Sequence, residues 1–139
     1  MYLGTGWSLI LFSFPGAELL TVQNYYAQFV PQVEAATHFF TWMTGFMLLS
    51  CIIMAVGEWK TWYKWCAIVT FCGVIGATAL TILYIFPYNA TMEGGITDAT
   101  ILHDVLHKWM RLNVIRVSLW TIQWTAMMIY FAAHLGDTR

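Results

Sequence analysis

Four long apolar stretches dominate the pattern of this chain. They cover residues 3–22, 38–56, 65–86 and 114–135. Each is close to the roughly 20 residues that a helix needs to cross the hydrocarbon core of a bilayer. None has the alternation expected of a membrane-barrel strand, and a helix satisfies its backbone hydrogen bonds within its own segment, as lipid requires. The pattern predicts a single all-α domain over residues 1–139, a four-helix transmembrane bundle with up-down topology.

The polar segments between these stretches set the expected connections. Residues 23–37 are polar and amphipathic, so we expect a long first connection there. The second connection, residues 57–64, is short, so we expect the second and third helices to be antiparallel neighbours. The fourth helix is expected to begin at Ala99, well before its membrane span, with Thr97 or Asp98 as its N-terminal cap.

The composition supports a membrane protein. Charged residues make up only 9% of the chain and hydrophobic residues 60%, whereas soluble domains are about 25% charged. This excludes a soluble enzyme or a disordered chain, and makes the lipid bilayer the expected partner. Six basic residues against seven acidic ones, with no basic stripe, exclude a nucleic-acid partner. The basic residues divide evenly between the two sides, and the short Lys60/Lys64 loop favours termini in the cytoplasm.

One stripe of the fourth helix carries polar and aromatic residues together. At about 100° per residue, this stripe contains Trp109, Asn113, Arg116, Trp120, Gln123 and Met127. An arginine and a glutamine in a membrane helix are expected to face the protein interior. Arg116 then has two interpretations, a structural ion pair with Glu18 or a cation that binds an oxyanion or a carboxylate. If Glu18 is unpaired, its raised pKa would suit a general base.

Histidines offer the one candidate metal site. His103 and His107 are four residues apart, a spacing that allows both to bind a transition metal, with Asp104 or His38 as a further ligand. They lie away from the inward stripe, however, so the alternative is a solvated pair on the outer face. No haem motif is present. We therefore expect no cofactor, with a transition metal at these histidines as the alternative.

Two motifs resemble a known family. Residues 85–89 (IFPYN) and 109–116 (WMRLNVIR), with the stretch YAQFVP at 26–31, are similar to the anthrone oxygenase-like family of small four-helix membrane proteins. The resemblance implies oxidation of polyketide anthrones to anthraquinones by molecular oxygen, without metal or flavin. It also implies that Asn89, Trp109 and Arg116 face inward at one end of the bundle. Asn113 stands where the family usually has a histidine, and an amide does not titrate.

These observations predict an oxidoreductase that acts on a lipid-soluble aromatic or quinone-like molecule. The expected catalytic residues are Glu18, Arg116 and Asn113, and the expected substrate-binding residues are Asn89, Trp109, Trp120 and Gln123. Because Asn113 replaces the histidine of the family, Glu18 or His38 would have to accept the proton that the substrate loses. Two alternatives remain open. One is a non-catalytic accessory subunit that stabilises a larger membrane complex, and the other is a carrier of a quinone-like molecule.

Overall fold

The computed structural model describes residues 2–17 and 19–137, and all of its regular structure in these ranges is helical. The elements are α1 (Tyr2–Ser8), η1 (Leu9–Ser13), α2 (Phe14–Ala17), α3 (Tyr25–Gly57), α4 (Lys64–Leu80), η2 (Thr81–Ile85), α5 (Phe86–Glu93) and α6 (Ala99–Asp137). The segments η1 and η2 are single π-helical turns that join their α-helical neighbours without a break. The described residues therefore form four helical segments, two of them containing a π-turn.

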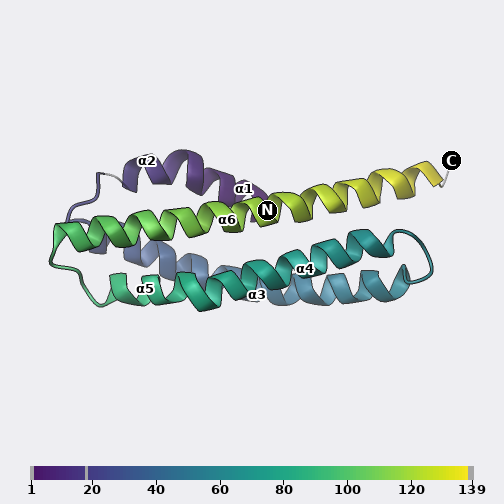
Figure 1. Ribbon diagram of the computed structural model, residues 1–139, viewed down its shortest axis with the longest axis horizontal. Helices are drawn as coiled ribbons and strands as arrows, with labels where there is room; N and C mark the ends of the chain where they lie inside the picture. The colour runs from purple at the N-terminus through teal and green to yellow at the C-terminus, as the bar shows by residue number, and fades with distance from the viewer. Residues whose placement is uncertain (1, 18, 138–139) are drawn as a thin grey trace.

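The four segments run along one another in an elongated molecule (Figure 1). α6 packs against α4 on one side and against α1 on the other, and α3 packs on α4 and α5. α1 begins near the middle of α6, so the N-terminal segment covers only the half of α6 that leads to the α5–α6 connection (Figure 1).

Most of the buried core lies at that same end of the molecule. The larger cluster of buried side chains consists of Ala17, Leu20, Tyr25, Val30, Ile85, Met92, Ile96, Leu102, Val105, Leu106 and Trp109. The hydroxyl of Tyr25 ties α3 to the α5–α6 connection, because it donates to the carbonyl of Met92 (3.2 Å) and accepts the N–H of Ile96. A smaller cluster of Ala77, Val117 and Trp120 joins α4 to the middle of α6.

Several helix ends differ from the expected ones. The first helical segment reaches only Ala17, and α3 begins at Tyr25, so most of residues 23–37 are helical rather than a connection. This stretch contains good helix formers and buries Tyr25 and Val30, which outweighs its polar character. α6 begins at Ala99, as expected, and Asp98 is its cap, since its Oδ1 accepts the N–H of Thr100 at 2.7 Å.

Two helices are long and apolar enough to cross a membrane by length and composition, Tyr25–Gly57 and the continuous helix Lys64–Glu93. Within the described residues, the N-terminal segment and α6 do not meet the same criterion. Large apolar side chains are nevertheless exposed on all four segments, for example Phe12, Trp42, Leu83 and Ile122.

Candidate functional site

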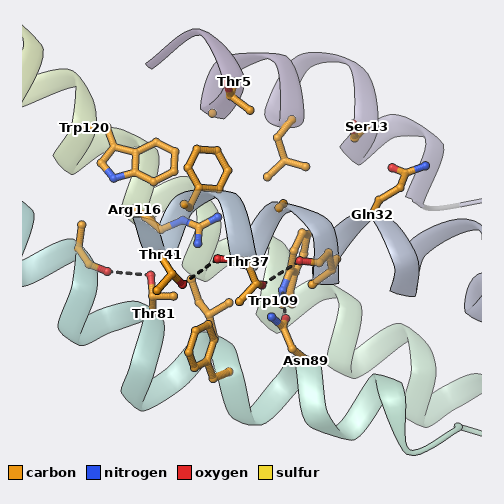
Figure 2. Close-up of a pocket in the computed structure, with 18 of the residues that line it drawn as sticks. Thr5, Ser13, Gln32, Thr37, Thr41, Thr81, Asn89, Trp109, Arg116 and Trp120 are labelled. Atoms are coloured by element: carbon orange, nitrogen blue, oxygen red, sulfur yellow. Dashed lines mark hydrogen bonds between the residues drawn. The ribbon is translucent and has the colours of Figure 1, made fainter. Parts of the chain in front are cut away.

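A cavity of about 570 Å³ lies between the N-terminal segment and α3. Its floor is formed by α4, η2, α5 and α6. Both π-turns line it, and π-turns inside α-helices are frequent at functional sites. The wall is mainly apolar, and its polar lining residues are Thr5, Ser13, Gln28, Gln32, Thr37, Thr41, Thr44, Thr78, Thr81, Asn89, Arg116 and Gln123 (Figure 2). Of the described residues that line it, Arg116 is the one with a charged side chain.

The stripe expected to face inward does so. Trp109 is 4% exposed, Asn113 0%, Trp120 7% and Gln123 4%, and Arg116 is half-buried. Asn89 joins them from α5 and is 8% exposed. With the exception of Asn113, these residues line the cavity. The structure thus brings together six of the seven residues predicted for the site.

Arg116 is oriented by two neighbours on its own helix. Its Nη2 donates a hydrogen bond to the Oδ1 of Asn113, and its guanidinium lies 4.9 Å from the centroid of a Trp120 ring. Asn113 is itself fixed, because its Nδ2 donates to the carbonyl of Trp109 at 2.8 Å. Stacking on Trp120 stabilises the charge, and Figure 2 shows the guanidinium pointing into the cavity towards Thr37 and Thr41. Asn113 therefore positions the cation rather than lining the cavity.

Asn89 and Trp109 close one end of the cavity. The indole Nε1 of Trp109 donates to the Oδ1 of Asn89 at 2.8 Å (Figure 2). The ring of Trp109 is held edge-on by Phe14 and Phe29, at centroid distances of 5.9 and 4.9 Å. Because the Asn89 oxygen accepts this bond, its amide nitrogen keeps its donors for another partner.

Gln123 contributes a buried amide next to Arg116 and Trp120. Its side chain packs so closely on Gly73 of α4 that a Cβ built there would lie 2.5 Å from its Cγ. Among the described residues the Gln123 Nε2 has no hydrogen-bond partner. A buried amide donor without a partner costs about 1–3 kcal/mol, and here the close packing of Gln123 on Gly73 covers that nitrogen.

The threonines of the cavity wall use their hydroxyl protons elsewhere. Thr37, Thr41, Thr44, Thr78 and Thr81 each donate to the carbonyl four residues earlier in the same helix, at 2.7–2.8 Å. They therefore present oxygen lone pairs to the cavity, whereas Arg116 and Asn89 carry N–H donors. Gln28 and Gln32 add amide donors from α3, and Arg116 supplies the charged donor, so a ligand with an acceptor oxygen near Arg116 fits this wall best.

The α3 wall of the cavity was not predicted from the sequence. Gln28, Gln32, Thr37, Thr41 and Thr44 line the cavity along one side of α3. Their spacing of three to five residues is that of one helical face. The sequence pattern places Gln28, Gln32 and Thr37 in a connection and only Thr41 and Thr44 in the second helix, so it divides this face between two elements.

The remaining predicted residues lie outside this arrangement. Glu18 falls outside the described residues. His38, His103 and His107 are exposed, as are Asp104 and Lys108 beside them. Within residues 2–17 and 19–137, no group of three or more His, Cys, Asp or Glu side chains lies close enough together to hold a metal ion.

Comparisons of the chain with family models, with curated proteins and with solved structures gave no match in any of the three.

Proposed function

We propose that this chain is an integral membrane protein, a four-helix transmembrane bundle whose cavity binds a lipid-soluble aromatic or quinone-like molecule. The membrane location is supported by the two long apolar helices and by bulky apolar side chains on the surface, such as Trp42 (75% exposed) and Leu83 (65% exposed). Soluble monomers rarely expose contiguous apolar patches of large area.

The observation that carries the proposal is a guanidinium stacked on Trp120 inside a largely apolar cavity. A volume of about 570 Å³ is in the range of small-molecule sites, which combine an apolar wall with a few well-placed polar groups. Hydrogen bonds to a charged donor are stronger than neutral ones, and more so where water is excluded. A carbonyl or oxyanion next to Arg116 would accept a charge-assisted hydrogen bond from the guanidinium, while a flat ring system fills the apolar space.

The position of the cavity supports access from the lipid. It lies between the N-terminal segment and α3, and each of these packs mainly on other helices. An apolar ligand dissolved in the bilayer would reach the cavity between these two segments without crossing water.

Removing the positive charge of Arg116 tests whether the cavity binds such a molecule. We expect Arg116→Gln to weaken binding of a 1,4-naphthoquinone probe, followed by quenching of tryptophan fluorescence in detergent, by about tenfold or more. Arg116→Lys should retain part of the affinity. Arg111→Gln removes an exposed arginine of the same helix and should leave the affinity unchanged. Wild-type affinity in Arg116→Gln, or equal losses in both glutamine variants, would contradict the proposal.

An oxidoreductase is a second candidate, favoured by the direct hydrogen bonds that link Asn89 to Trp109, Trp109 to Asn113 and Asn113 to Arg116. The resemblance implies that an anthrone and molecular oxygen give an anthraquinone and water. In this reaction Arg116 and Asn89 would stabilise the developing oxyanion. Asn113 cannot remove the substrate proton, so Glu18 is the proposed base.

Oxygen uptake with an anthrone as substrate tests this second candidate. We expect Asn113→His to create or raise turnover and Glu18→Gln to lower it. No gain in Asn113→His, with naphthoquinone binding intact, would support a carrier instead. Recovery of the chain only within a larger assembly, and without a bound small molecule, would support an accessory subunit.

A further inference from the structure

A second hollow lies between the N-terminal segment and residues 107–114 of α6. It is a groove of about 680 Å³ between η1–α2 and α6, and it shares only the Phe14 side chain with the cavity described above. Phe14 packs edge-on against Trp109, so these two rings stand between the two spaces. The groove is therefore separate from the cavity.

One rim of the groove is basic. His107, Lys108 and Arg111 line it, and all three are exposed. Asp104 forms an ion pair with Lys108 at 2.7 Å, but both side chains are more than half exposed, and such pairs contribute little. The hydrogen bond from Lys108 to Asp104 raises the pKa of the lysine, which keeps it protonated. A lysine ammonium has three donors, so Lys108 can bind a second anion beside Asp104.

The other rim is apolar. Ile10, Phe14 and Val114 line it, and Val114 is 42% exposed. The groove thus lies where the exposed residues of α6 change from ionisable to uncharged. Up to Arg111 they include five ionisable side chains, whereas from Val114 to Phe131 no exposed residue is charged. In the proposed membrane protein, this change marks the level of the lipid headgroups.

We infer that this groove binds the headgroup of an anionic phospholipid, with Lys108 and Arg111 on the phosphate and one acyl chain along Ile10, Phe14 and Val114. The inference rests on the proposed membrane location but not on the ligand of the cavity. A free anion would match the basic rim alone and leave the apolar rim without a partner. A phospholipid matches both.

The test compares lipids that differ only in headgroup charge. Native mass spectrometry of the full chain in detergent, with phosphatidylglycerol or phosphatidylcholine of identical acyl chains, measures the preference for the anionic lipid. Basic residues near a membrane surface each contribute a factor of about five to binding of anionic lipid. We therefore expect Lys108→Gln/Arg111→Gln to lower the preference about 25-fold. Lys60→Gln/Lys64→Gln, at the opposite end of the molecule, is the matched control and should keep it.

The outcomes separate this inference from the proposed function. Equal binding of the two lipids, or an equal loss in both double variants, would overturn the groove as a lipid site. Displacement of phosphatidylglycerol by millimolar inorganic phosphate would show a site for free anions and would also overturn it. Alkaline extraction of expressing membranes tests the shared premise. A chain released by carbonate contradicts the membrane location, whereas a retained chain without lipid preference contradicts the groove alone.

Discussion

The contact between α1 and α6 is made at a glycine, and this contact gives the sharpest prediction. A Cβ on Gly6 would lie 2.7 Å from Val117 Cγ2 and 2.8 Å from Trp120 Cε3. Favourable carbon–carbon contacts are about 3.5–4.0 Å, so Gly6→Ala must push α1 away from α6 by about 1 Å or displace Trp120. Overpacking of this kind costs about 1–3 kcal/mol.

Gly4 provides the matched control, because it lies in the same helix and a Cβ there would meet no atom within 4 Å. Both substitutions gain the helix propensity of alanine, about 0.5–1 kcal/mol. The difference between them therefore isolates the clash. In mixed micelles titrated with sodium dodecyl sulfate, we expect the free energy of unfolding of Gly6→Ala to lie about 1–3 kcal/mol below that of Gly4→Ala.

Tryptophan fluorescence supplies a second readout for the same pair of variants. Since Trp120 also lines the cavity, Gly6→Ala should change the emission and weaken binding of the naphthoquinone probe, whereas Gly4→Ala should not. Equal free energies of unfolding for the two variants, with unchanged emission, would refute the close packing of α1 on α6.

Three further predictions concern other contacts. Gly73→Ala should be about 1–3 kcal/mol less stable than Gly76→Ala, because a Cβ at residue 73 clashes with the side chain of Gln123 and a Cβ at residue 76 does not clash. In the double variant Gly73→Ala/Gln123→Ala, this loss of stability should be relieved. Tyr25→Phe leaves the buried N–H of Ile96 without its partner, whereas the Met92 carbonyl still accepts the N–H of Gly95. This variant should cost about 1–3 kcal/mol in the same titration, with faster amide exchange in the α5–α6 connection. Asp98→Ala should lower stability by about 1 kcal/mol through loss of the helix cap, and Asp98→Ser should restore most of it.

The sequence predicts the start of α6 and its inward stripe well, because both have local signals. Arg116 and Gln123 stand out in an apolar segment, and the cap at Asp98 is a local signal. The helix that contains η2 is different. It is apolar on nearly every side, so its periodicity says little about which residues are buried.

Non-local contacts decide the parts that the sequence does not predict. The start of α3 at Tyr25 depends on the hydroxyl contacts that Tyr25 makes with Met92 and Ile96, far along the chain. No local pattern encodes these contacts. The cavity likewise depends on which helices pack together, since its α3 wall faces an N-terminal segment that packs mainly on α6.

The π-turn η2 has a consequence for the phase of the helix around it. At about 100° per residue, an uninterrupted α-helix would place Ile85 and Asn89 about 80° and 120° away from Ala77. A π-turn adds about one residue to its turn and returns both side chains to the buried side, where they are 2% and 8% exposed. Deleting one residue within Thr81–Ile85 would therefore rotate Asn89 away from Trp109 while leaving α4 in place. The orientation of the Asn89 amide therefore depends on the number of residues in η2 as well as on the identity of residue 89.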